Sequence, residues 1–218
     1  MRSPKNIEPS TVVLTFDDGP NGTDSITLKL LEILQKHQVK AHFCLIGSNV
    51  KEHPDIVRKI YSDGHPIVCH GFDDRSILLK SNKTISDEMD LWHNEIKIAL
   101  NTDSFTYRYF RPPYGMYRPG LRKILSEKNL KILPFSFYAL DAQKGPKGKF
   151  EVLDETVKKI RKSNGGVIVL HDGRDSRAKM AREIAKDPSG SYNRAWIPEI
   201  VDSLITILSK ENYHFTEL

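Results

Sequence analysis

The sequence predicts an α/β fold in which parallel strands form a barrel of βα units. Apolar, β-branched runs alternate along the chain with segments whose apolar residues recur at helical spacing. Strands that alternate with helices are typical of parallel sheets and barrels. Seven candidate strands are present, and this number fits a barrel better than a short open sheet.

The predicted strands and helices follow one another along the whole chain. We expect strands at 11–16, 40–46, 66–70, 107–110, 130–137, 167–170 and 213–217. We expect helices at 26–37, 86–100, 118–128, 153–162 and 197–210. Two long connections remain, at 71–85 and 172–195, and connections of this length in a compact domain are usually functional or mobile. The second contains SRAKMAREIAK, a candidate short basic helix above the predicted site.

Length and composition are those of an ordinary globular protein. The 218 residues suffice for a sizeable core, so we expect 1–218 to form a single domain with a loop insertion around 172–195. Lys and Arg exceed Asp and Glu by 33 to 28, a mild excess that would attract an acidic polymer. The basic residues are scattered and form no nucleic-acid motif, so we expect no binding of nucleic acid. We also expect a monomer.

The cysteines and the N-terminal residues indicate the expected cellular location of the chain. Cys44 and Cys69 form no CxxC pair, and we expect two buried thiols rather than zinc ligands or a disulfide. No apolar run is long enough to span a bilayer, and MRSPKNIEPS lacks the apolar centre of a signal peptide. The expected location is cytoplasmic for the chain as written. It is the cell envelope or the exterior if an export segment has been removed.

Ionisable residues follow five of the predicted strands. The carboxyl ends of parallel strands share one rim, where the active sites of barrel enzymes form. For TFDDGP alone, a simple turn is the competing interpretation, because Asp-Gly and Gly-Pro favour turns. Five coincident strand ends favour a reaction site instead. The residues at these ends are Asp17 and Asp18, His70, Arg111, Asp141, and His171 with Asp172.

Five short motifs follow one another along the chain: TFDDGP, HGFDD, RPPYG, FYALDA and VLHD. They resemble those of the polysaccharide deacetylases, also called the NodB-homology or carbohydrate esterase 4 family, and the resemblance covers 11–171. The resemblance implies a distorted (β/α) barrel and a metal-dependent hydrolase that removes N-acetyl groups from a polysaccharide. The substrate would be a chitin-like polymer, peptidoglycan or an exopolysaccharide. The implied cofactor is a divalent metal, foremost zinc, with cobalt, manganese, nickel or iron as alternatives.

The resemblance also implies the chemical roles of the strand-end residues. Asp18 and His70 would ligate the metal, which acts as a Lewis acid and activates water. Asp17 would be the general base, kept ionised and oriented by Arg111. We expect strand alternation and the turn to point the two adjacent aspartates in different directions. His171 would be the general acid that protonates the leaving amine.

Further residues would orient these groups and bind the substrate. Asp141 would hold the imidazole of His171. In RPPYG, the backbone N–H of Tyr114, next to Pro113, would stabilise the oxyanion. Val169 is expected on the strand face of His171, where it would line the pocket for the acetyl methyl group.

Two positions depart from the family pattern. Asp74 stands where the family has its second metal histidine, and we expect it to complete an Asp-His-Asp site that selects zinc less strongly. Alternatively, Asp74 only caps a turn, or Asp73 takes its place. Ala142 replaces a usual tryptophan and would remove an apolar wall near His171. These departures leave two other functions open: an O-acetyl esterase, or a weakly active or inactive carbohydrate-binding relative.

Overall fold

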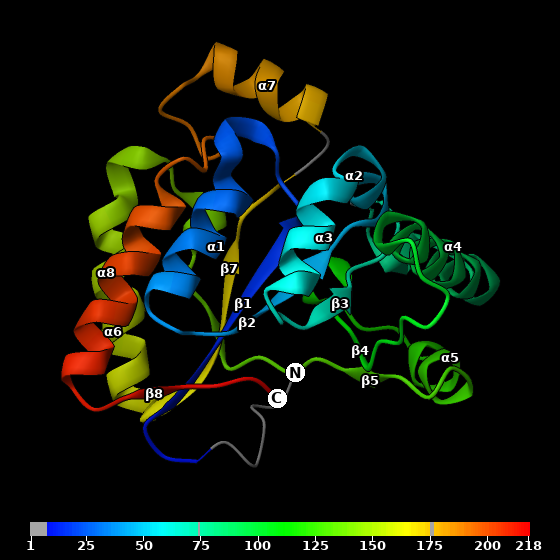
Figure 1. The fold of residues 1–218 in the computed structure, drawn as a ribbon, viewed down its shortest axis with the longest axis horizontal. Helices are drawn as coiled ribbons and strands as arrows, with labels where there is room; N and C mark the ends of the chain where they lie inside the picture. Colours follow the sequence, from blue (N-terminus) through cyan, green and yellow to red (C-terminus); the bar gives the residue numbers. More distant parts are fainter. Residues whose placement is uncertain (1–7, 74, 175–176) are drawn as a thin grey trace.

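The computed structural model describes residues 8–73, 75–174 and 177–218. Its centre is a parallel sheet in the order β5-β4-β3-β2-β1-β7-β6, and β8 pairs with β1 beside this path (Figure 1). The predicted barrel of about seven parallel strands is confirmed. The strands are β1 (Thr11–Gly19), β2 (Ala41–Leu45), β3 (Ile67–Cys69), β4 (Tyr109–Phe110), β5 (Lys131–Ile132), β6 (Phe137–Tyr138), β7 (Gly165–His171) and β8 (His214–Phe215).

The predicted strand 130–137 is wrong as a single element. It is two short strands, β5 and β6, that lie at opposite edges of the sheet. Pro134 stands between them, and proline has no N–H to donate to a strand ladder. The chain therefore leaves one edge after Ile132 and reaches the other at Phe137, so this short crossing spans the opening of the barrel.

Helices pack around the outside of the sheet (Figure 1). The five predicted helices are present, α8 with the predicted ends and the other four with shifted ends, whereas α2 and α3 were not predicted. Helix α4 begins at Asn82, inside the predicted connection, because the Ser81 hydroxyl caps it by accepting from the Thr84 N–H at 3.0 Å. The helices are α1 (Ile26–Lys36), α2 (Gly47–Glu52), α3 (Pro54–Ser62), α4 (Asn82–Leu100), α5 (Leu121–Glu127), α6 (Lys149–Ser163), α7 (Arg177–Lys186) and α8 (Ile197–Lys210).

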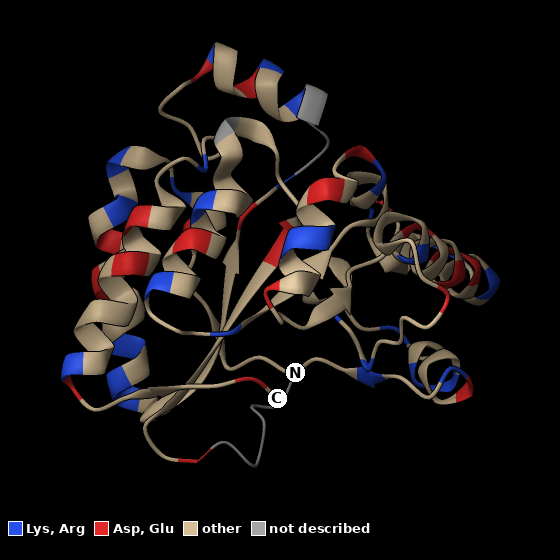
Figure 2. Cartoon of the chain, viewed as in Figure 1, with Lys and Arg blue, Asp and Glu red and all other residues tan. Residues whose placement is uncertain are grey.

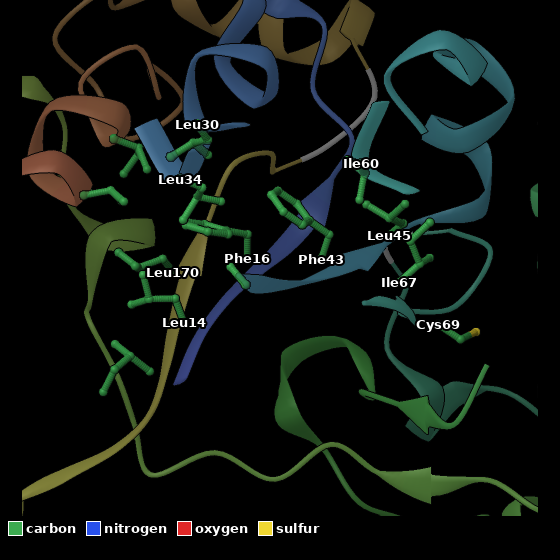
Figure 3. Close-up of a cluster of buried hydrophobic side chains, with 14 of the residues drawn as sticks. Leu14, Phe16, Leu30, Leu34, Phe43, Leu45, Ile60, Ile67, Cys69 and Leu170 are labelled. Atoms are coloured by element: carbon green, nitrogen blue, oxygen red, sulfur yellow. The ribbon is translucent and has the colours of Figure 1, made fainter. Parts of the chain in front are cut away.

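The main hydrophobic core lies between the sheet and these helices. Side chains of β1 and β2 alternate, so that one set packs against the helices (Figure 3). Phe16 and Phe43 lie in this layer with their ring centroids 5.3 Å apart. The other set points into the barrel, where Cys44 contacts a second, smaller apolar cluster. Cys44 and Cys69 are buried free thiols, as predicted.

Lys, Arg, Asp and Glu positions of both signs are interspersed along the helices around the sheet (Figure 2). Lys36 of α1 and Asp202 of α8, for example, form an ion pair of 2.8 Å between neighbouring helices. In the part of the chain that the structure describes, no helix has both the length and the apolar character needed to cross a membrane.

Candidate active site

A cavity of about 300 Å³ lies at the carboxyl ends of the strands. It brings together four of the predicted catalytic and metal-binding residues: Asp17 and Asp18 from β1, His70 after β3, and His171 at the end of β7. Helix α7 lies above this end of the barrel, which confirms the predicted basic helix (Figure 1). The other described residues that line the cavity are Tyr114, Tyr138, Ala142, Gln143, Arg174, Lys179 and Tyr192.

A bulge at the end of β1 turns both aspartates toward the same cavity. Asp17 pairs with Cys44 and Gly19 with Leu45, so Asp18 is an extra residue in the ladder, with a left-handed φ of 72°. The Nε2 atom of His70 lies 3.3 Å from Asp18 Oδ1 and 3.9 Å from Asp17 Oδ2. The expectation that the two side chains diverge is therefore wrong, because the bulge cancels the alternation of the strand.

Close approach of β7 explains the glycine of TFDDGP. A β carbon at Gly19 would lie only 2.5 Å from Oδ2 of Asp172. That carboxylate is buried and accepts a 2.5 Å hydrogen bond from the Thr27 hydroxyl. Burial raises the pKa of Asp172 to about 7. Asp172 thus joins β7 to the start of α1 beneath the cavity.

Asp18 and His70 are suitable metal ligands. The Nδ1 atom of His70 lies 2.7 Å from the Arg111 carbonyl oxygen, which can only accept, so Nδ1 carries the proton. Nε2 is therefore the ring nitrogen left to bind a metal ion, and it lies 3.3 Å from Asp18 Oδ1. Within the described ranges, no group of three or more His, Cys, Asp or Glu side chains could hold a metal ion. The third predicted ligand, Asp74, lies outside these ranges.

Asp73, the alternative third ligand, is already engaged. Its Oδ1 lies 2.6 Å from Lys80 Nζ, and its Oδ2 lies 3.3 Å from Arg75 Nε. These two cations compete with a metal ion for its carboxylate. The contacts therefore disfavour Asp73 as a ligand.

Arg111 holds Asp17 from inside the barrel. Its NH1 donates to Asp17 Oδ1 at 2.7 Å and to the Thr15 hydroxyl at 2.5 Å, while NH2 donates to the Pro134 carbonyl at 3.2 Å. Burial alone would raise the pKa of Asp17, but the charge of Arg111, with smaller contributions from His70 and His171, lowers it below its usual value. The predicted pairing of Arg111 with Asp17 is present.

Asp141 holds His171 from the opposite side of the cavity. Its Oδ1 lies 3.0 Å from His171 Nδ1, and its Oδ2 accepts from the His171 backbone N–H at 2.9 Å. Burial would lower the pKa of His171, but the charge of Asp141 outweighs this effect and raises it to about 9. His171 is therefore protonated near neutral pH, as a general acid must be.

Arg194, which was not predicted as a site residue, contacts Asp141. Arg194 is fully buried; its NH1 donates to the Asp141 carbonyl at 2.6 Å and lies 3.6 Å from Asp141 Oδ2. It belongs to none of the five motifs and stands in the long connection, among many basic residues that pattern alone marks as exposed. The sequence contains no signal that would have singled it out.

Tyr138 was also missed, although it lies within the FYALDA motif. Its ring is nearly parallel to that of His171, with centroids 6.3 Å apart. Tyr138 therefore forms a flat wall beside His171. The effect expected of Ala142, which lines the same cavity, remains a prediction.

The three predicted substrate-binding residues differ in their placement. Tyr114 lines the cavity in a left-handed conformation, with φ 59°. Val169 is fully buried between β1 and β6. Neither Val169 nor Pro113 is among the described residues that line the cavity. The roles given to all three remain predictions.

Comparisons with known proteins identify the family of this chain. A family model described as polysaccharide deacetylase matches residues 5–133. The chain is 28% identical over 216 residues to the peptidoglycan-N-acetylmuramic acid deacetylase PdaA of Bacillus subtilis, a match that covers 98% of this chain and 72% of the relative. Further curated relatives are longer, and the chain spans 52%, 46% and 41% of three of them.

Two solved structures share the fold. The chitin deacetylase of the fungal pathogen Colletotrichum lindemuthianum superposes with a TM-score of 0.78 at 21% identity, over 96% of this chain and 85% of that one. BA3943 of Bacillus anthracis, described as a CE4 family pseudoenzyme, superposes with a TM-score of 0.70 at 22% identity, over 95% of this chain and 63% of that one. The barrel is thus shared by deacetylases and by a relative described as inactive.

Proposed function

Because the chain belongs to the polysaccharide deacetylase family, we propose that it hydrolyses N-acetyl groups of a polysaccharide in this cavity with the help of a divalent metal. One observation carries the proposal. A carboxylate kept ionised by Arg111 and an imidazole kept protonated by Asp141 line the same cavity. Amide hydrolysis requires an ionised base and a protonated acid at the same pH. Here the surroundings lower the pKa of the base and raise that of the acid.

Hydrogen bonding determines which atoms of these groups react. Oδ1 of Asp17 is bonded to Arg111, so Oδ2 remains to take a proton from the attacking water. Nδ1 of His171 is bonded to Asp141, so Nε2 remains to give a proton to the departing amine nitrogen. The backbone N–H of Tyr114 would stabilise the negative charge that develops on the acetyl oxygen.

Asp18 and His70 would hold the metal, with Asp74 as the third ligand. When bound, a divalent cation supplies Lewis acidity toward the acetyl carbonyl. The donor types, carboxylate oxygen and imidazole nitrogen, suit zinc, and a second carboxylate in place of a histidine also admits manganese, cobalt, nickel or iron.

Two of the proteins compared above support one class of polymer. PdaA is described as a deacetylase of peptidoglycan and the Colletotrichum lindemuthianum protein as a deacetylase of chitin, which supports a polymer of N-acetylated amino sugars. A peptidoglycan substrate would place the working enzyme at the cell envelope. The alternative of a weakly active or inactive relative is favoured by Asp74, which departs from the family pattern in the metal site itself.

Acetate release tests the proposal. The protein is stripped of metal, its residual metal content is measured, and it is reconstituted separately with zinc, cobalt, manganese, nickel and iron. We expect acetate from N-acetylated oligosaccharides only after reconstitution. Release from O-acetylated sugars alone would identify an esterase. No release with any metal, together with retained glycan binding, would identify an inactive relative.

A further inference from the structure

Tyr138 brings a hydroxyl to the cavity wall, and the proposed reaction gives this group no role. The residue ends β6, and its ring lies beside the imidazole of His171. We propose that the Tyr138 hydroxyl donates a hydrogen bond to the acetyl oxygen of the substrate while negative charge develops on that oxygen. This inference rests on the proposed deacetylase function and adds one catalytic residue to it.

Strand pairing directs the Tyr138 side chain into the barrel. Tyr138 lies opposite Val169 of β7, and the next N–H, of Ala139, donates to the Val169 carbonyl at 3.0 Å. The preceding residue, Phe137, packs against the core under the helices, so strand alternation turns Tyr138 to the inner face of the sheet. The ring of Phe135 lies 4.7 Å from that of Tyr138, between centroids. The sheet and a neighbouring ring thus hold the phenol in place.

The hydroxyl lies against the backbone of the RPPYG motif. A β carbon at Gly115 would collide with the Tyr138 hydroxyl oxygen, so the missing side chain leaves room for this oxygen. Gly115 also has a left-handed φ of 63°, which favours glycine. It directly follows Tyr114, whose backbone N–H is the proposed donor to the acetyl oxygen. The hydroxyl therefore lies on the side of the cavity where the acetyl oxygen is expected.

The phenol is a protonated donor near the charged groups of the reaction. Burial raises the pKa of Tyr138, the charge of Asp17 raises it further, and the charge of Arg111 opposes both effects. Among the described residues, Tyr138 forms hydrogen bonds through its backbone, such as the 3.1 Å bond that its carbonyl accepts from Lys159 Nζ, and its hydroxyl has no partner. Its proton is therefore available to a bound substrate.

A second donor suits the movement of electrons in amide hydrolysis. As the water oxygen bonds to the acyl carbon, Asp17 takes a proton from the water and the π electrons of the carbonyl move to its oxygen. The carbonyl then re-forms, the C–N bond breaks, and the nitrogen takes a proton from His171, which gives acetic acid and the free amine. Exchange with water returns the proton from Asp17 to His171, and Tyr138 keeps its own proton throughout. Its hydrogen bond strengthens as the oxygen gains charge, so it stabilises the transition state more than the bound substrate.

Tyr138→Phe tests the hydroxyl, because it removes one oxygen and keeps the ring. With metal-loaded protein and an oligosaccharide of N-acetylated amino sugars, kcat should fall by at least about 10-fold, less than the about 100-fold or more that loss of an oxyanion donor costs in another hydrolase, because Tyr114 still donates. KM and metal content should stay within about twofold of wild type. Tyr117→Phe is the matched control, since Tyr117 is an exposed tyrosine that is not among the described residues lining the cavity. It should keep the wild-type kcat.

A series of acyl groups distinguishes a hydrogen bond from a structural role. The N-acetyl groups are replaced by N-fluoroacetyl and N-difluoroacetyl groups, and release of free amine is measured. Fluorine withdraws charge from the developing oxyanion, so the oxygen depends less on a donor. The ratio of wild-type to Tyr138→Phe kcat should therefore shrink along the series. A distorted site would slow all three substrates by the same factor.

The possible results separate the role of Tyr138 from the activity of the protein. A wild-type kcat in Tyr138→Phe, or the same loss for all three acyl groups, would overturn the hydrogen bond and leave the deacetylase intact. Loss of metal from Tyr138→Phe would also overturn it, because the hydroxyl would then support the metal site instead. If wild type releases no amine from any of the three substrates with any of the metals, both the deacetylase and this role of Tyr138 are contradicted.

Discussion

At the scale of single residues, Asp17 and Asp18 differ through their contacts rather than their chemistry. Asp17 is bonded to a buried arginine, whereas the carboxylate of Asp18 lies 3.3 Å from Nε2 of His70. An arginine keeps a carboxylate charged and fixed, which suits a base, while a neutral imidazole nitrogen offers a second metal donor. The β1 bulge makes this division possible, because it brings both side chains to one side of the strand.

The first prediction concerns Asp17. Asp17→Asn keeps the size of the side chain but removes the proton acceptor, so acetate release should fall by at least about 100-fold, the lower range of general-base effects. Metal content, measured by elemental analysis, should stay at the wild-type level. Asp18→Asn is the companion variant and should lose metal. If Asp17→Asn loses metal instead and recovers activity in excess metal, the roles of the two aspartates are reversed.

A second prediction concerns the third metal ligand. Asp74→Ala should weaken metal binding by about 10-fold or more. Loss of a metal ligand should weaken binding more than loss of a residue that only hydrogen-bonds to a ligand. Asp73→Ala is the matched control and should bind metal as wild type does, since its carboxylate is engaged by Lys80 and Arg75. Asp74→His should raise zinc affinity relative to manganese.

Metal titration of the three variants decides the matter. Equal affinity of Asp74→Ala and wild type would show that Asp74 is no ligand. A loss of affinity in Asp73→Ala alone would transfer the role to Asp73, and its present ion pairs would then have to break when metal binds.

The site residues that the sequence could reveal are those that follow strands. Asp17, His70 and His171 were predictable because strand ends converge at one rim of a barrel. Arg194 and Tyr138 were not, because their roles depend on how a connection and a short edge strand fold back over that rim. The local sequence pattern does not show that a later segment of the chain folds back over this rim.

At the scale of elements, short strands and connections explain most of the differences. The run at 130–137 reads as one strand because its residues are apolar, yet Pro134 divides it between two edges of the sheet. Helix α2 has six residues and is too short for helical periodicity to show. Helix α3, of nine residues, does bury Ile56, Val57 and Ile60 at helical spacing, and this pattern was overlooked. Long amphipathic helices such as α8, at 14 residues, were predictable.

The third prediction tests the connection between β7 and α8 through Arg194. Arg194→Gln should lower kcat by up to about 100-fold, because a small displacement of Asp141 misplaces His171. Metal content should not change, since Arg194 contacts the acid side of the site. Arg194→Lys should restore part of kcat by returning a charge near Asp141. A purely structural role would lower the folded fraction but leave kcat per folded molecule unchanged, so activity is normalised to active-site content.

A surface arginine of the same connection serves as the control. Arg182 pairs with Glu183 on the exterior of α7, and Arg182→Gln should leave kcat unchanged and the melting temperature nearly so. Equal kcat per folded molecule for Arg194→Gln and Arg182→Gln would contradict the positioning role.

At the scale of the whole molecule, the barrel has two sides with different chemistry. The outer side of the sheet is a continuous apolar layer under the helices. The inner side holds polar groups along its length, from Asp17 and Arg111 at the rim that carries the cavity to His42 near the start of β2. His42 is fully buried, and neither of its ring nitrogens has a hydrogen-bond partner among the described protein atoms.

This arrangement makes the stability of the fold sensitive to acid. Burial, reinforced by the charge of Arg111, lowers the pKa of His42 from 6.5 to about 4. Between these two pH values, the unfolded chain takes up a proton at His42 that the folded protein does not. Above about pH 6.5, the titration of His42 does not reduce the free energy of unfolding. As the pH falls from 6.5 toward 4, the free energy of unfolding decreases, because only the unfolded chain gains the proton.

The last prediction is that His42→Leu protects the protein against acid. Leucine fills a similar volume, has no polar atoms to leave unpaired and cannot take up a proton. The free energy of unfolding of the variant, measured in urea, should therefore exceed that of wild type by a margin that grows from pH 7 to pH 4, up to about 3 kcal/mol. His65→Leu is the matched comparison, because the pKa of His65 is likewise lowered to about 4. Its Nδ1, however, accepts the Ala41 N–H at 3.3 Å, so this variant should show the same trend from a lower starting stability. If the difference in unfolding free energy between His42→Leu and wild type stays constant with pH, His42 takes up its proton at the same pH in the folded barrel as in the unfolded chain, and the prediction is wrong.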